Sequence, residues 1–113
     1  MTRDTKNLPP SGAGDFARKW PDVWERYTEL GHAAAGAGDL SPRERRLVKL
    51  ALALGAGSEG AVHSHTRQAQ EEGIGARDLR QIGLLAITTL GFPAAMAGLS
   101  WVNDIVEAES GKE

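Results

Sequence analysis

The amino-acid sequence predicts an all-α fold, a single-domain bundle of about five helices that assembles into a homo-oligomer. Five segments place apolar residues three and four positions apart, which is the period of a helix with one buried face. No segment alternates apolar and polar residues long enough to suggest a strand. The connections between segments are short, as in a bundle of antiparallel neighbours. The length of 113 residues, with 41% hydrophobic and 25% charged residues, fits one globular domain.

The first part of the chain is expected to be a flexible tail followed by one helix. Residues 1–14 are polar and rich in proline and glycine, so we predict a flexible tail there and a helical domain over 15–113. Pro21 fits the first turn of a helix but not its interior, so the helix should start there after a short turn at 15–20. Gly36 and Gly38 should end it. Its apolar stripe consists of Phe16, Trp20, Val23, Trp24, Tyr27 and Leu30.

The next two helices have explicit start signals. Ser41 is a predicted N-cap, with Pro42 in the first helical position and Glu44 completing a capping box. This helix should end at Gly55 and bury Leu47, Leu50, Ala51 and Leu54. Ser58 is a second predicted N-cap and opens a helix that ends at Gly73.

Two apolar helices complete the predicted bundle. The segment "ARDLRQIGLLAITTLG" should form a helix from Ala76 that closes at Gly91, and Pro93 should begin the last one. The inward residues are expected to be Leu79, Ile82, Leu85, Ala86 and Leu90 in the first, and Ala94, Ala97, Trp101, Val102 and Ile105 in the second.

The composition argues against several functional classes. A formal charge of −2 and a pI near 5.9 are unlike a nucleic-acid-binding domain. The basic residues Arg43, Arg45, Arg46 and Lys49 are interpreted as a solvated helix face. The sequence shows no signal-like segment and no apolar run of about 20 residues, so we expect no membrane partner and a cytoplasmic protein. The absence of cysteine excludes disulfides and every thiol mechanism.

His63 and His65 are two residues apart and should point to nearly opposite sides of their helix, because each residue turns about 100°. His65 shares the apolar face with Ala61, Val62 and Ala69. Two interpretations remain open for it: a buried histidine bonded to a backbone carbonyl, or a titratable group in a pocket.

His63 lies between Glu59 and Arg67 at helical spacing, which predicts a solvated polar row. We expect no metal site, because Glu59 and His63 supply only two ligands. His32 should face the negative end of its helix dipole. No phosphate loop, nucleophile elbow or Glu-x-x-His pair is present, so no cofactor is expected either.

The order of these pieces resembles the carboxymuconolactone decarboxylase and alkylhydroperoxidase D superfamily. The resemblance runs from about residue 21 to 109 and is carried by "LSPRERRLVKLALALG", the capped "SEGAVHSH" and "LGFPAA". It implies an alkylhydroperoxidase D-like fold. Members with peroxidase activity carry Cys-x-x-Cys followed four residues later by histidine, and these positions fall on Ser58, Ala61 and His65. A relay carboxylate twelve residues before the first cysteine falls on Arg46.

The resemblance leaves a site without thiols, and this excludes the disulfide-based peroxidase because a serine hydroxyl cannot substitute for a thiolate. The decarboxylase branch needs hydrogen-bond donors or a cation to stabilise a carboxylate and a developing enolate. It also needs an acid that protonates carbon. His65 is the candidate acid and Arg46 the candidate anion-binding group. Ser58, Ala61, Glu44 and Glu59 are the remaining candidates for contact with substrate.

Three functions stay open from the sequence. The first is a lyase-type enzyme that acts on a small organic molecule, either anionic or neutral. The second is a non-catalytic binder of such a molecule, and the third is a structural or partner-binding relative that lost the site. Homo-oligomers are expected because Leu84, Leu85, Ile87, Leu90 and Leu99 cannot all enter one small core. The resemblance implies trimers or hexamers.

Overall fold

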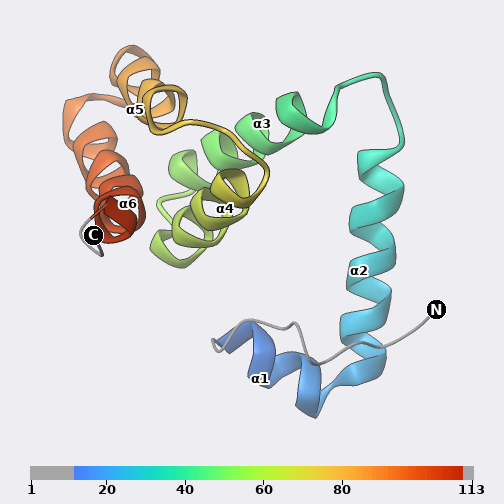
Figure 1. Cartoon of the computed structure of the whole chain (residues 1–113). Coiled ribbons are helices and arrows are strands. Elements are labelled where there is room, and N and C mark those ends of the chain that lie inside the picture. Colours follow the sequence, from blue (N-terminus) through green and yellow to red (C-terminus); the bar gives the residue numbers. More distant parts are fainter. Residues whose placement is uncertain (1–11, 111–113) are drawn as a thin grey trace. The chain divides into compact units, whose positions relative to one another are not determined.

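The computed structural model describes residues 12–110, with side chains described as far as residue 108. The secondary structure of this part is entirely α-helical, as predicted (Figure 1). The helices are α1 (Gly12–Lys19), α2 (Pro21–Ala35), α3 (Pro42–Gly55), α4 (Glu59–Glu71), α5 (Ala76–Leu90) and α6 (Phe92–Ser110). None of these helices combines the length and the apolar character that crossing a membrane would require.

The chain begins its helical structure earlier than the sequence indicated. A turn was predicted at 15–20, but α1 is a helix that starts at Gly12, inside the expected tail. Trp20 separates α1 from α2, and the Trp20 amide still donates to the carbonyl of Phe16 at 2.8 Å. Pro21 takes the first position of α2, where its missing N–H costs no hydrogen bond. The rest of the predicted tail, residues 1–11, lies outside the described residues.

The predicted caps of α3 and α4 are confirmed. The Ser41 hydroxyl accepts from the amide of Glu44 at 3.1 Å, and the Glu44 carboxylate accepts from the amide of Ser41 at 2.7 Å. The Ser58 hydroxyl accepts from the amide of Ala61 at 3.3 Å. Gly73 follows the end of α4 with φ +86, a left-handed conformation that L side chains rarely adopt. These caps fix the starts of the two helices that carry the candidate site.

The described part of the chain divides into two compact units, one before and one after the boundary between Asp39 and Leu40. In the first unit, α2 buries no residue completely, and Trp24 of α2 contacts Phe16 of α1. Trp24 is the centre of this contact, with its ring 6.5 Å from Phe16 and 5.6 Å from Tyr27. Trp20, Val23, Tyr27 and Leu30 of the predicted stripe are exposed within the described chain.

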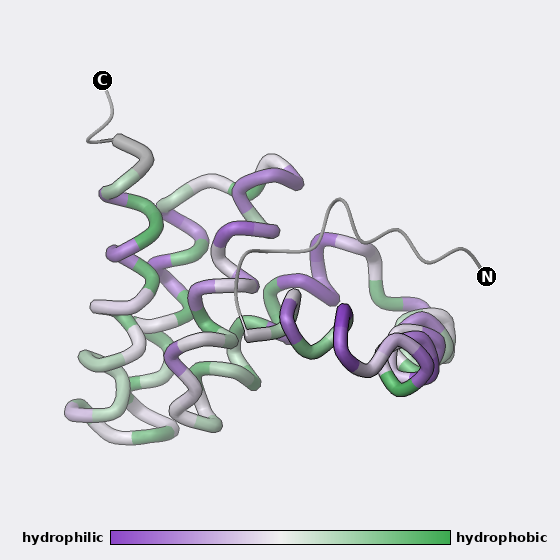
Figure 2. Tube along the Cα trace, turned by 90° about the horizontal axis from the view of Figure 1, so that it is seen from below, coloured by the Kyte–Doolittle hydropathy of each residue, from purple (hydrophilic) through white to green (hydrophobic). Residues whose placement is uncertain are grey.

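The second unit holds the main core, which helices α3 to α6 enclose. Figure 2 shows hydrophobic and hydrophilic stretches alternating along these helices, as amphipathic packing requires. All four helices contribute residues to the most deeply buried part of this core. These residues are Leu50, Leu54, Val62, Ala69, Leu79, Ala95 and Val102. The largest shared contacts join α5 to α6 and α3 to α4.

The buried faces differ from the predicted ones at several positions. Ala51, Leu85, Leu90 and Ala94 were expected inside but are exposed. On α6 the core instead receives Ala95 and Val106, which shifts the buried face by about one residue. The predicted inward residues Leu50, Leu54, Leu79, Ala86 and Val102 are buried, so the predicted faces of α3, α5 and α6 are correct to within about one residue.

Two glycines allow helices to approach closely. A Cβ atom added at Gly98 of α6 would lie 2.4 Å from Cγ of Leu54 on α3. One added at Gly83 of α5 would lie 2.5 Å from Cγ of Leu99 on α6. In both cases a leucine side chain occupies the space of the missing methyl group, so the glycines set the distance between helices.

Candidate functional site

Arg46 of α3 and His65 of α4, the two predicted catalytic candidates, are in direct contact. Nη1 of Arg46 lies 2.7 Å from Nδ1 of His65. The same guanidinium donates from Nε and Nη2 to the two carboxylate oxygens of Glu72, both at 2.9 Å, and from Nη2 to Oε1 of Gln68 at 3.0 Å. We call Arg46, His65, Gln68 and Glu72 the arginine–histidine cluster.

Helical spacing explains why three members of the cluster come from one face. Gln68 and Glu72 follow His65 by three and seven residues, and these spacings place their side chains along one side of α4 and its C-cap. The packing of α3 along α4 brings Arg46 to this row. Gln68 and Glu72 were not among the predicted site residues, although their i+3 and i+7 spacing from His65 is visible in the sequence.

The contact with Arg46 determines the protonation state of His65. Arginine has only donors, so Nδ1 of His65 must accept and the ring proton must lie on Nε2. His65 is half-buried, and burial lowers its pKa below the usual range. The charges of Arg46 and Lys49 lower the pKa further, and Glu72 opposes them. His65 is therefore a neutral hydrogen-bond donor near pH 7.

Glu72 balances the charge of Arg46. The hydrogen bond from Arg46 lowers the pKa of the Glu72 carboxyl, so this residue is ionised at neutral pH. The Arg46 side chain is only 17% exposed, whereas that of Glu72 is 45% exposed. The bidentate geometry orients the guanidinium toward His65 and leaves one N–H of Nη1 without a hydrogen bond to the described residues.

This arrangement suits the binding of an oxygen acceptor better than proton transfer to carbon. As a general acid, His65 would have to be protonated on both nitrogens, and Arg46 would then face a second cation across 2.7 Å. As a donor, the neutral ring offers Nε2–H, and the guanidinium behind it supports negative charge on a bound group. The alternative interpretation was a histidine hydrogen-bonded to a backbone carbonyl. The described contacts of His65 include no such bond.

The other predicted contact residues have structural roles in this chain. The Ser58 hydroxyl caps α4 and Ala61 supplies the amide that it binds. The Glu44 carboxylate is engaged in the capping box, and its hydrogen bonds with Ser41 lower its pKa. Glu59 lies 4.0 Å from His63 rather than near His65. None of these four residues makes a described hydrogen bond to the arginine–histidine cluster.

His63 does not belong to a solvated row, and that prediction is wrong. Its Nε2 atom lies 2.9 Å from a carboxylate oxygen of Asp104 on α6, and its side chain is only 20% exposed. Asp104 was not predicted as a partner of His63, because no spacing in the sequence tells which turn of α6 lies opposite His63. His32, by contrast, lies in the last turn of α2 as predicted.

Basic residues of α3 bind individual partners, and Arg43 and Lys49 are exposed, as predicted for a solvated face. Arg43 pairs with Asp78, near the start of α5. The Arg45 guanidinium donates to the carbonyl of Leu40 at 2.6 Å. Arg46 belongs to the arginine–histidine cluster. Three of the four positive charges therefore have partners within the chain.

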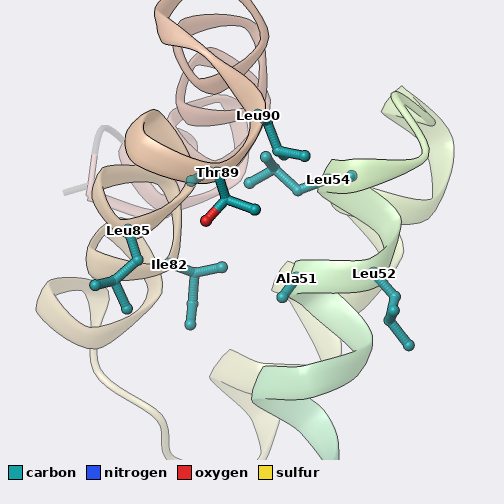
Figure 3. Close-up of a pocket in the computed structure, with 9 residues that line it drawn as sticks. Ala51, Leu52, Leu54, Ile82, Leu85, Thr89 and Leu90 are labelled. Atoms are coloured by element: carbon teal, nitrogen blue, oxygen red, sulfur yellow. The ribbon is translucent and has the colours of Figure 1, made fainter.

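A separate apolar pocket of about 410 Å³ lies between α3 and α5 (Figure 3). Figure 3 shows Leu54 and Leu90 together near one end of it and Ile82 and Leu85 toward the other. Thr89 contributes the single hydroxyl group of the lining. None of its lining residues belongs to the arginine–histidine cluster, so the charged groups and this pocket are distinct features.

Comparison with known proteins agrees with the resemblance seen in the sequence. The sequence model of the Carboxymuconolactone decarboxylase family matches residues 21–104, which is most of the chain and includes the whole arginine–histidine cluster. No curated protein gives a significant match. The match covers the segment in which family peroxidases carry their cysteines, yet this chain contains none. The chain therefore belongs to the carboxymuconolactone decarboxylase family, as a member that lacks cysteine.

Proposed function

We propose that this protein binds a small organic anion at the arginine–histidine cluster. The observation that carries the proposal is the 2.7 Å contact between Arg46 and His65, which places a neutral Nε2–H donor beside a guanidinium. Membership of the family supports a small-molecule role for this region. A carboxylate or a lactone carbonyl is the type of group that such donors stabilise.

Any reaction at this site proceeds without thiol chemistry. Peroxide reduction through a disulfide needs two thiols, and the chain has none. If the bound anion is converted, the resemblance implies decarboxylation of the lyase type. In that reaction the bond to the carboxyl carbon would break, CO₂ would leave, and the electron pair would remain as an enolate that His65 and Arg46 stabilise. A proton from water would then be taken up by the enolate carbon. Ser58 and Ala61 would border the substrate at the start of α4.

A thermal-shift screen with small carboxylates and lactones tests the proposal. A ligand that binds only the folded state raises the melting temperature, and at 100 times Kd it adds about 2.7 kcal/mol of stability. The shift should vanish in His65→Ala and persist in the matched control His32→Ala. If no compound shifts the melting temperature, or if the shift is unchanged in His65→Ala, the proposal is wrong.

The alternative is a non-catalytic, structural relative that kept the fold and lost the site. The observation that favours it is the bidentate pairing of Arg46 with Glu72, which neutralises the charge that an anion would need. Glu72→Gln separates the two proposals, because it leaves the guanidinium without its anionic partner. Under the binding proposal this variant binds the screened anions more tightly, and under the structural alternative it only loses stability.

We also propose that the chain forms a homo-oligomer. Leu52, Leu84 and Leu85 are 64%, 56% and 60% exposed, and they lie at or beside the apolar pocket between α3 and α5. Of the five apolar residues that were not all expected to fit one core, Ile87 and Leu99 pack inside the second unit. Burial of the exposed leucines against another subunit would remove an apolar surface from water. The resemblance implies a trimer or hexamer.

Light scattering coupled to size exclusion at low micromolar concentration tests the assembly. Leu85→Glu should shift the population toward the 12.0 kDa chain, because the charge could not be buried at low cost in an apolar interface. Arg67→Glu, at an exposed position of α4, is the control. A folded wild-type monomer under these conditions would contradict the proposal.

A further inference from the structure

Glu59, His63 and Asp104 bring three potential metal ligands together on the surface of the second unit. One ligand atom from each side chain lies within 4.8 Å of the other two. Nε2 of His63 faces both carboxylates, at 2.9 Å from Asp104 and 4.0 Å from Glu59. We propose that these residues form a binding site for a divalent transition-metal ion, namely Zn²⁺. We call it the Glu–His–Asp site.

The packing of two helices positions the three groups. Glu59 and His63 are one turn apart on α4, so their side chains lie on the same face. Asp104 comes from α6, which packs along α4. Val62 of α4 and Val102 of α6 are completely buried beside these positions, and they hold the two helices together in the core. The site is therefore supported on two rigid elements.

The distances are compatible with coordination of one ion. In a tetrahedral zinc site with bonds of about 2.0–2.1 Å, neighbouring ligand atoms are about 3.3–3.4 Å apart. The observed separations of 2.9 and 4.0 Å lie on either side of this value. The two carboxylate side chains are 59% and 54% exposed, so they have room to rotate toward an ion.

Charge and accessibility also fit a cation. The two carboxylates supply negative charge, which a divalent ion neutralises. The nearby Arg80 does not occupy the site, because it binds Asn103 and Glu107 instead. When Zn²⁺ binds Nε2, the ring proton moves to Nδ1, so neutral imidazole remains the ligand. Because the carboxylates are exposed, the ion can reach the site from solvent. Water can then occupy its remaining coordination positions.

The mixture of ligands determines which ion is expected. Imidazole nitrogen favours Zn²⁺ and its neighbours in the transition series, whereas Mg²⁺ and Ca²⁺ favour sites made only of oxygen ligands. Three protein ligands with at least one position for water also match the usual stoichiometry of an open zinc site. The site does not share residues with the arginine–histidine cluster, and His63 and His65 project from different sides of α4.

Isothermal titration calorimetry with Zn²⁺ tests the proposal on the full, untagged chain after treatment with a chelator. We expect one equivalent of Zn²⁺ per chain, with no comparable binding of Mg²⁺. His63→Ala and Asp104→Asn should each weaken binding by more than about ten-fold, because even the loss of an outer-shell partner has an effect of this size. Circular dichroism should show that both variants keep their helical content.

Matched variants separate this site from other zinc-binding groups. His32→Ala removes a histidine from α2, and Glu107→Gln removes an exposed carboxylate from the next turn of α6. Both should bind Zn²⁺ like the wild type. The proposal is overturned if the wild type binds no stoichiometric Zn²⁺, or if His63→Ala and Asp104→Asn, still folded, bind it with unchanged affinity.

Discussion

Replacement of Gly98 by alanine tests the close approach of α6 to α3, the helix that carries Arg46. The new Cβ atom would lie 2.4 Å from Cγ and 2.7 Å from both methyl carbons of Leu54. Carbon atoms in good contact are about 3.5–4.0 Å apart, so the overlap is about 1 Å. Leu54 is only 3% exposed and is packed against the rest of the core, although it also lines the apolar pocket between α3 and α5. The helices must therefore separate or Leu54 must adopt another rotamer.

The expected loss of stability is about 2 kcal/mol. Overpacking of a core costs about 1–3 kcal/mol, and the overlap with the branch point of Leu54 argues for the upper end. Replacing a mid-helix glycine by alanine returns about 1 kcal/mol through helix propensity. For a unit of this size, a loss of about 2 kcal/mol lowers the melting temperature by about 8–16 °C.

Urea denaturation followed by circular dichroism, at one fixed protein concentration, measures the effect. Gly31→Ala is the matched control, because it lies inside α2 and a Cβ atom there meets nothing within 4 Å. This control should be neutral or slightly stabilising. The clash should also disappear when Leu54→Ala makes room, although that change alone costs about 2–5 kcal/mol. A Gly98→Ala variant as stable as the wild type, or an equal penalty in the Leu54→Ala background, would refute the reasoning.

Three further predictions concern the candidate site. In Arg46→Gln the pKa of His65 should rise, because the variant removes a positive charge that lowers this pKa. An NMR titration of the imidazole measures the change. A pKa that does not rise would contradict the assigned contact. The free energy of unfolding should fall as the pH drops below about 6.5, because His65 binds a proton more readily in the unfolded chain than in the folded one. Urea titrations between pH 7.5 and 5.5 should show a smaller fall in His65→Gln, and an equal fall would exclude His65 as its cause. Purified protein with a dithiol reductant should not reduce an alkyl hydroperoxide, and a rate proportional to protein concentration would contradict the exclusion of peroxidase chemistry.

Local signals in the sequence were sufficient to predict most helix boundaries. The serine N-caps and the terminal glycines act within a few residues, so Ser41, Ser58 and Gly91 mark helix ends whatever the helices pack against. The resemblance to a family directed attention to Arg46 and His65, which the fold brings into contact. The short helix α1 was missed because its sequence, GAGDFARK, contains two glycines and has little helix propensity.

The tertiary structure alone decided which turns of neighbouring helices face one another. Helical periodicity assigns residues to a common face of one helix, but it does not say which neighbour that face meets. Glu72 was therefore not recognised as the partner of Arg46, and Asp104 was not recognised opposite His63. On α5 and α6, where apolar residues surround much of each helix, close packing at Gly83 and Gly98 selects the buried face. The identity of the helices follows from local chemistry, whereas the pairing of their side chains follows from how closely the backbones can approach.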